Sequence, residues 1–404
     1  MDASAVFMIA GIIIMTGFFG IFFFDKTKIP DVLLLLGIGL LLGPVLGFID
    51  PGSLGHFTEY FGSLALVIIL FEGGMDMGID RLIKEFGAAS LLVVVSYLLT
   101  MSGIAAFLYF IKHWEFMQSL LLGAILGCTS AAIVIPIISR MDIREEIKTI
   151  VSVESALSDV LAVVLTITLV DIIILGTTGI RSPFRAIANS FSTALIGGAA
   201  AGIVWLKVLN YFKDKKYSYM FTLAAVLILY GTISFLGGSG AISVLIFGII
   251  LGNSRSFSRF LKISDDLLIE DTIKFFHGEM TFFIRTFFFV YMGMIITFKE
   301  LGWEFLLTSI SIFLIIILMR YASIGLTVQL FKDKKHDRFL IMSMLPRGLA
   351  SAVLAIMPAS MNVPGSDLFV DITFAVIILT NILMTLGVYL SDRGMKNIPR
   401  PNLW

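Results

Sequence analysis

Thirteen predominantly apolar stretches follow one another along the 404 residues of this chain. A helix needs about 20 apolar residues to cross a bilayer, and most of the stretches reach that length. Hydrophobic residues make up 58% of the sequence and charged residues 14%, whereas a soluble domain averages about a quarter charged. The sequence therefore predicts an all-α polytopic membrane protein. Its thirteen transmembrane helices are expected at 4–24, 30–49, 58–79, 87–111, 116–138, 148–175, 187–211, 218–236, 239–252, 273–297, 303–331, 339–360 and 368–390.

Lysine and arginine residues are divided unequally between the two sides that these spans define. Of the 29 basic residues, 22 fall in loops and termini on one side, 4 on the other and 3 inside spans. Cytoplasmic loops carry the excess of basic residues, so we expect the N-terminus outside and the C-terminus in the cytoplasm. The charged stretch 255–275 predicts an amphipathic surface helix that links two halves.

No polar stretch is long enough for a soluble domain, so we expect one membrane domain over 1–404 and no cytoplasmic regulatory domain. The sequence has no nucleotide-binding glycine pattern, zinc-ligand spacing or catalytic triad. We therefore expect no enzyme, no cofactor and no nucleic-acid partner. All four histidines lie at or near span ends, and we expect His277 in particular at the solvated interface.

Polar and charged side chains from five spans fall at a common depth. Counting about 1.5 Å per residue from the cytoplasmic ends places them roughly 9–17 Å into the bilayer. A charge at the centre of a membrane helix costs about 2.5–3.5 kcal/mol, and such residues commonly mark ion pathways. The set comprises Glu72, Thr129, Glu154, Asp159, Arg320 and Arg347. Arg285 lies as deep as Asp159, without an assigned partner.

The sixth span carries two carboxylates on adjacent helix faces. Ser155 and Asp159 are four residues apart and share one face, and their oxygens can bind a small hard cation. Glu154 shares the neighbouring face with Ser158. An arginine partner for Glu154 would lower the cost of burying both charges.

The fifth and twelfth spans resemble each other weakly. Each has small residues at mid-span that close on a proline, over 129–136 and 349–358. The spans are seven apart, an odd offset, so the two repeats would be inverted. Paired interrupted helices in inverted repeats indicate the binding site of a secondary transporter. Ordinary packing of small residues between helices is the alternative.

The segment "ESALSD" at 154–159 resembles the Glu-Ser-x-x-Asn-Asp signature of NhaP-type sodium/proton antiporters, in the cation/proton antiporter superfamily. Four further segments are similar to that family, in its order: "LFEGGMD" at 70–76, "GCTSAAIVIP" at 127–136, "MRYASIG" at 319–325 and "PRGLASAVLA" at 346–355. The resemblance implies thirteen helices, crossed broken helices at spans 5 and 12, and a homodimer in a prokaryotic cytoplasmic membrane. It implies inverted repeats at about 4–175 and 218–390. Core helices are expected at about 87–175 and 303–390, with scaffold and dimer helices at about 4–79 and 218–297.

The same resemblance implies roles for individual residues. Asp159 would be the group for which cation and proton compete, and Na⁺, or K⁺ or Li⁺, would bind at Asp159, Ser155 and Thr129. Glu72, Ser130 and Ser158 would complete the surroundings of the cation. Glu154 would pair with Arg320, with Arg347 nearby.

Two positions depart from the family pattern. Ser130 stands where the family usually has aspartate, and Ser158 where it usually has asparagine. Ion choice depends on the number and field strength of the ligands, so sodium, potassium and lithium all stay open. One titrating carboxylate per site favours exchange of one cation for one proton, which is electroneutral.

We therefore expect a secondary antiporter that exchanges a monovalent cation for protons by alternating access. A sodium-coupled carrier of an organic anion on a related fold is one alternative, and a cation channel is another. A carrier would take up a carboxylate, and a channel would conduct cations without a proton gradient.

Overall fold

In the computed structural model, all the regular secondary structure in the described part of the chain is helical. The described residues are 3–27, 30–47, 55–76, 79–139, 141, 143–175, 181–212, 218–261, 271–295, 302–327 and 335–396. They form sixteen α-helices and two short π-helical segments. The all-α fold class predicted from the sequence is confirmed.

Each of the thirteen predicted ranges contains a helix or a pair of helical elements. In the first half these are α1 (Ala3–Thr27), α2 (Asp31–Leu40), η1 (Leu41–Val45), α3 (Gly55–Asp76), α4 (Ile79–Ala106), η3 (Phe107–Ile111), α5 (Phe116–Leu126), α6 (Ala131–Ser139) and α7 (Glu145–Leu175). The second half holds α8 (Arg181–Phe212), α9 (Ser218–Phe235), α10 (Gly240–Gly252), α11 (Ser254–Leu261), α12 (Asp271–Ile295), α13 (Trp303–Leu326), α14 (Lys335–Ser343), α15 (Leu349–Ser360) and α16 (Phe369–Lys396).

Five helical segments in the described residues are long and apolar enough to cross a bilayer. They are Ser90–Ile111, Ile150–Ile174, Ala188–Phe212, Trp303–Leu326 and Phe369–Ser391. Seven shorter apolar helices accompany them. The chain is thus an integral membrane protein, and the number of thirteen spans stays a prediction.

Only the two ends of the surface helix expected at 255–275 are described, and both are helical. Helix α11 ends at Leu261, and α12 begins at Asp271; residues 262–270 lie outside the described part.

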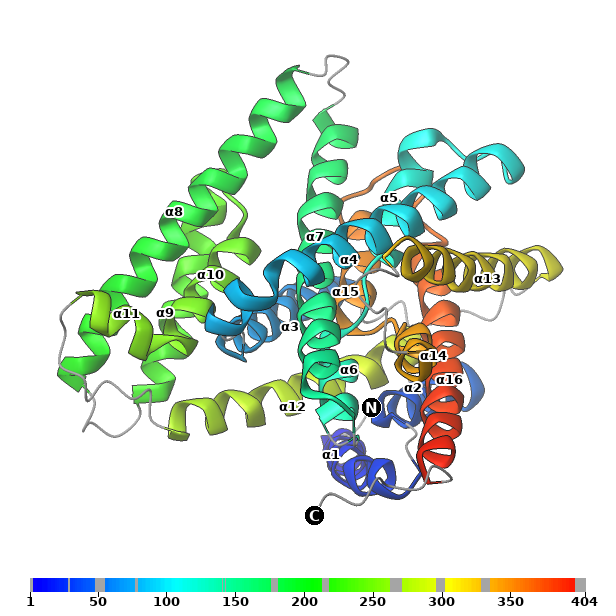
Figure 1. The fold of residues 1–404 in the computed structure, drawn as a ribbon, viewed down its shortest axis with the longest axis horizontal. Coiled ribbons are helices and arrows are strands. Elements are labelled where there is room, and N and C mark those ends of the chain that lie inside the picture. The colour runs from blue at the N-terminus through cyan, green and yellow to red at the C-terminus, as the bar shows by residue number, and fades with distance from the viewer. Residues whose placement is uncertain are drawn as a thin grey trace.

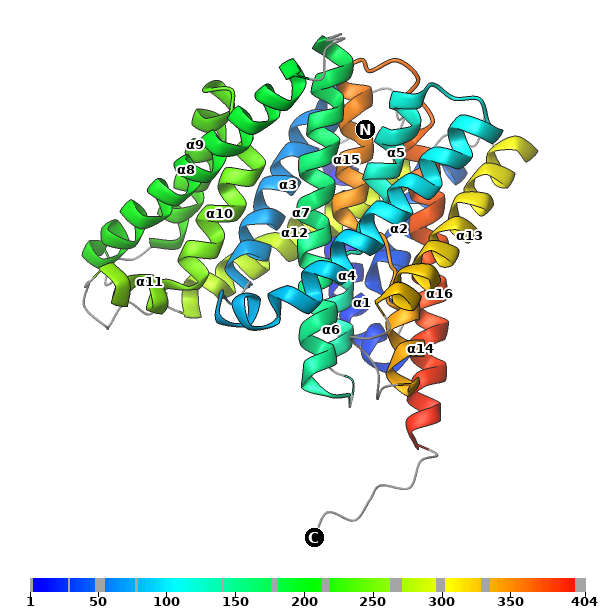
Figure 2. The same ribbon diagram turned by 45° about the horizontal axis from the view of Figure 1, so that its top comes forward.

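Helix α7 runs through the middle of the molecule, with α8 to α11 on one side and α13, α14 and α16 on the other (Figure 1 and Figure 2). Helix α10 packs against α3, α8 and α9, and buried side chains of these four helices form a hydrophobic cluster of their own. The other buried apolar residues form one larger cluster that includes α4 to α7 and α12 to α16. The candidate site described below lies within this larger cluster.

The contact between α3 and α10 is made backbone to backbone. A Cβ atom added at Gly248 would lie 3.2 Å from the Cα of Gly74 and 3.2 Å from the backbone nitrogen of Met75. Membrane helices approach this closely only through small residues. These glycines therefore hold α3 and α10 together.

Two of the predicted spans are interrupted. Helix α5 ends at Leu126 and α6 begins at Ala131, while α14 ends at Ser343 and α15 begins at Leu349. The interruptions, 127–130 and 344–348, lie at the start of or just before the two small-residue stretches. Pro136 and Pro358 are both helical.

Candidate cation-binding site

The two interruptions touch each other. The backbone N–H of Ser130 donates a hydrogen bond of 2.9 Å to the carbonyl of Pro346. Because unwound backbone inside a membrane must find partners within the protein, each interruption satisfies part of the other. Helix α7, which carries the predicted carboxylates, packs against both α6 and α15.

Asp159 lies where α7 faces the start of α6. Its Oδ2 accepts a hydrogen bond of 3.2 Å from the backbone N–H of Ala131, the first residue of α6. Its Oδ1 is buried and has no hydrogen-bond partner among the described residues. A helix N-terminus favours a negative charge, and a buried oxygen without a partner is costly. The carboxylate is therefore arranged to accept one further ligand, either a proton or a cation.

Ser158 of α7 forms hydrogen bonds with the first interruption. The N–H of Thr129 donates to the Ser158 Oγ at 3.0 Å, and the two side-chain oxygens are 3.3 Å apart. The Ser158 hydroxyl itself donates to the carbonyl of Ser155 at 2.9 Å. The serine that replaces the family's asparagine thus holds the unwound backbone beside Asp159.

Ser155 is buried, and its hydroxyl donates to the carbonyl of Val151 in its own helix at 2.9 Å. That bond uses the hydroxyl proton and leaves the oxygen lone pairs available for a cation. Ser130, the other departure from the family pattern, is also buried and packs against Gly348 at the start of α15.

Gly348→Ala is expected to disrupt the junction of the interrupted helices. The added Cβ would lie 2.6 Å from the Cβ of Ser130 and 3.0 Å from the Cδ1 of Ile133. Overpacking of this kind costs about 1–3 kcal/mol. We expect a lower melting temperature in detergent together with loss of exchange. Gly231→Ala is the matched control, since no atom lies within 4 Å of its added Cβ, and a control that melts as low as Gly348→Ala would contradict the steric explanation.

Glu154 forms a buried ion pair with Arg320 of α13. Both nitrogens of the guanidinium fork contact the carboxylate, NH1 at Oε1 and NH2 at Oε2, the latter at 2.9 Å. The same guanidinium donates to the Oγ of Ser96 in α4 and to the carbonyl of Ile341 in α14. Arg320 therefore joins α4, α7, α13 and α14, and Glu154 supplies its counter-charge.

Arg347 neutralises carbonyl groups at the interruptions. Its Nε donates to the carbonyl of Leu126, the last residue of α5, at 2.9 Å, and its NH1 donates to the carbonyl of Leu345 at 2.7 Å. A cation at a helix C-terminus is favourable. The Tyr97 hydroxyl of α4 donates to the nearby carbonyl of Ala124 at 2.7 Å, so two side chains cap the end of α5.

The carboxylate of Glu72 lies at the contact between α3 and α12. Its Oε1 is 3.7 Å from the position that a Cβ would take at Gly278.

The prediction that His277 lies at a solvated interface is wrong. His277 is fully buried, its ring centroid is 4.7 Å from that of Phe71, and neither ring nitrogen has a hydrogen-bond partner among the described residues. The close packing of α3 on α12 covers this part of the helix.

From the sequence, Arg285 has no assigned partner. In the structure it forms an ion pair with Asp31 at the start of α2. The guanidinium NH2 lies 2.7 Å from the Asp31 Oδ2. The two residues are 254 positions apart, and no sequence pattern connects them. Their pairing fixes α12 against α2.

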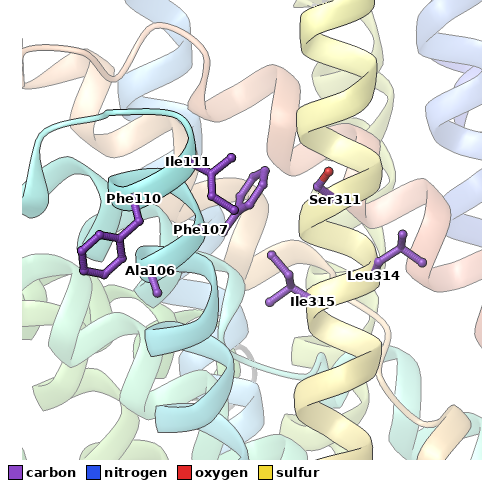
Figure 3. Close-up of a pocket in the computed structure, with 7 residues that line it drawn as sticks. All are labelled: Ala106, Phe107, Phe110, Ile111, Ser311, Leu314 and Ile315. Carbon is purple, nitrogen blue, oxygen red and sulfur yellow. The ribbon is translucent and has the colours of Figure 1, made fainter.

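A separate pocket of about 490 Å³ lies between the end of α4 with η3 and the middle of α13. Figure 3 shows its lining, which includes Phe107, Phe110, Leu314 and Ile315, and of the seven labelled residues only Ser311 has a polar side chain. It contains none of the predicted site residues. Its apolar lining does not suit a small cation.

The class of protein is defined by an all-helical membrane fold in which two interrupted helices meet beside a buried carboxylate. Residues 12–390 match the family model described as "Sodium/hydrogen exchanger, transmembrane", and the chain belongs to that family. It is 29% identical over 370 residues to the K(+)/H(+) antiporter NhaP2 of Shewanella baltica, which covers 88% of this chain and 61% of the relative. It is 27% identical over 356 residues to Na(+)/H(+) antiporter 1 of Methanocaldococcus jannaschii, which covers 82% and 78%.

Solved structures share the fold. The sodium proton antiporter MjNhaP1 from Methanocaldococcus jannaschii at pH 8 superimposes with a TM-score of 0.75 at 23% identity, over 98% of both chains. The chain spans about three fifths of the length of the NhaP2 relatives that it matches. The resemblance to the NhaP-type antiporters stated from the sequence is confirmed at the level of family and fold.

Proposed function

We propose that the protein exchanges a monovalent cation for protons across the membrane, through a site at Asp159. The observation that carries the proposal is the buried Oδ1 of Asp159, which lacks a hydrogen-bond partner among the described residues, beside the meeting point of two interrupted helices. Transporters of this kind bind their ions at such helix interruptions. Family membership supports the same reading.

The mechanism that we propose rests on competition at one carboxylate. When Asp159 is ionised, its Oδ1 binds a dehydrated cation together with oxygens of Thr129 and Ser155. When a proton occupies the carboxyl, its charge is gone and the cation leaves. Because Ser130 replaces the family's second carboxylate, one negative charge serves both ions. We therefore propose that one cation exchanges for one proton, without net charge movement.

The transported cation is proposed to be Na⁺, K⁺ or Li⁺. Similar proteins are named K(+)/H(+) antiporters in Shewanella and a Na(+)/H(+) antiporter in Methanocaldococcus, and these names differ in the ion. Ion preference depends on the size of the site and the field strength of its ligands. Of the two serine replacements, Ser130 lies in the first interruption and Ser158, on α7, binds the backbone of that interruption, so both affect these properties.

For the architecture, we propose alternating access by a core of residues 87–175 and 303–390 against a scaffold of 4–79 and 218–297, within a homodimer. The two halves would be inverted repeats, at about 4–175 and 218–390. Support comes from the direct contact of the two interruptions, both of which fall in the proposed core. The close glycine contact of α3 and α10 supports a rigid scaffold.

Exchange by the wild-type protein can be tested in proteoliposomes that enclose a pH-sensitive dye. With a proton gradient across the membrane, addition of Na⁺, K⁺ or Li⁺ in turn should move protons for at least one of these ions. Under electroneutral exchange, an imposed membrane potential should leave the rate unchanged. Cation current without a proton gradient, or a response only to an added carboxylate, would contradict the proposal.

A further inference from the structure

Four consecutive residues at the first interruption, 128–131, are each held by a different partner. The backbone of Thr129 is bound by Ser158 and that of Ala131 by Asp159, both on α7. The backbone of Ser130 is bound by the carbonyl of Pro346. The side chain of Cys128 contacts Ser351 of α15, with the Sγ 3.3 Å from the serine Oγ. Two anchors thus come from α7 and two from the second interrupted span.

The Cys128 contact is the weakest of the four anchors. A thiol is a weak donor and a weak acceptor, and its other hydrogen bond, to the carbonyl of Ile125, is long at 3.8 Å. Both Cys128 and Ser351 are almost completely buried, at 1% and 0% exposure. Water therefore does not compensate for the weakness of this contact.

Ser351 differs from other buried serines of the interrupted region. The hydroxyls of Ser155 and Ser158 donate to carbonyls of their own helix, and those of Ser119 and Ser343 do the same. The Ser351 hydroxyl instead has the Cys128 thiol as its partner among the described contacts. It is thus directed across the junction, toward the first interruption.

Cys128 is close in the sequence to two residues of the site that the proposed function uses. Cys128 directly precedes Thr129, one of the proposed cation ligands, and lies three residues before Ala131, whose N–H binds Asp159. The distance between Thr129 and Asp159 decides the size of the cation site. The contact between Cys128 and Ser351 fixes the position of residue 128 and therefore affects the distance between Thr129 and Asp159.

We propose that Cys128 and Ser351 are positioning residues that set which monovalent cation the site prefers. The inference rests on the proposed function at Asp159. The sulfur keeps the contact at 3.3 Å, whereas a hydroxyl–hydroxyl bond is about 2.7–2.8 Å. The thiol thus holds the interruption further from α15 than a serine would. Ion preference follows the size of the site and its ligand geometry, so the sulfur–oxygen contact is a determinant of selectivity.

The test compares apparent KM values and maximal rates for Na⁺, K⁺ and Li⁺ in proteoliposomes. The variants are Cys128→Ser, Cys128→Ala, Ser351→Ala and the double variant Cys128→Ala/Ser351→Ala. Loss of one modest hydrogen bond corresponds to a change of about three- to tenfold. We expect apparent KM to change by that factor, unequally for the three ions and by more than the maximal rate changes.

Because the two side chains act through one contact, the double variant should shift KM no more than the larger single shift. Ser119→Ala is the matched control, since Ser119 is a buried serine on α5 whose hydroxyl donates to the carbonyl of Glu115. It should leave the ion preference unchanged.

The proposal is overturned if every Cys128 and Ser351 variant that folds keeps its KM within about 1.5-fold of wild type for each ion. It is equally overturned if the effects of the single variants simply add in the double variant, or if Ser119→Ala shifts the preference as strongly. These outcomes leave the proposed function standing, provided that Asp159→Asn is inactive. An active Asp159→Asn variant would reject the proposed function itself.

Discussion

Asp159→Asn should reduce cation/proton exchange in proteoliposomes to the rate of protein-free liposomes. An amide carries no titratable proton and no negative charge at neutral pH, so the substituted side chain can neither release a proton nor balance a cation. The fold should survive, because the amide has nearly the same volume and its oxygen can still accept the N–H of Ala131. The measurement is dye-reported proton movement, together with a melting curve in detergent.

Asp171→Asn on the same helix is the matched control for this prediction. Asp171 lies twelve positions further along α7 and is exposed, so loss of its charge should leave exchange unchanged. If Asp159→Asn retained more than half of the wild-type rate while Asp171→Asn behaved normally, Asp159 would not be the exchange site.

Arg320→Ala is expected to destabilise the protein rather than alter its ion preference. The substitution leaves Glu154 buried with no counter-charge and removes the hydrogen bonds to Ser96 and Ile341. Removal of one partner of a buried ion pair costs about 3–5 kcal/mol, and Arg320 is only 3% exposed. We expect low yields in membranes and a strongly lowered melting temperature in detergent.

A double variant separates the stranded charge from the lost packing. Arg320→Gln/Glu154→Gln should melt higher than Arg320→Gln alone, because no ionised group is left buried without a partner. Glu304→Gln is the control on the same helix. It removes the partner of Lys112 in an ion pair whose glutamate is 86% exposed, and such surface pairs contribute little. Wild-type melting of Arg320→Ala would reject the structural role of the pair.

Much of the fold could be predicted because apolar length and helix formation are coupled in a membrane. Backbone groups must be satisfied within each segment, so a long apolar run already specifies a helix. The positions of the interruptions were harder to predict from the sequence. The small residues at 131–135 and 349–355 are compatible with helix and proved helical. The segments that unwind are held open by tertiary contacts, such as that between Ser130 and Pro346.

The site was predictable to the extent that its chemistry is local. Glu154 and Asp159 stand out because a buried carboxylate in an apolar helix is costly, and such a carboxylate calls for an arginine partner. The choice of Arg320 came from the family resemblance. Contacts between segments that are distant in the sequence could not be predicted in this way. Nothing in the sequence joins Asp31 to Arg285, aligns Cys128 with Ser351, or shows that the packing of α3 on α12 buries His277.

The hydrogen bond between Ser130 and Pro346 has a mechanical consequence. While it persists, the two unwound segments are joined, and the starts of α6 and α15 move together. In the alternating access that we propose, sliding is then expected elsewhere, at the surfaces where α15 touches α3 and α12. In that mechanism the bond keeps the proposed ion site within one unit, apart from the helix surfaces that move.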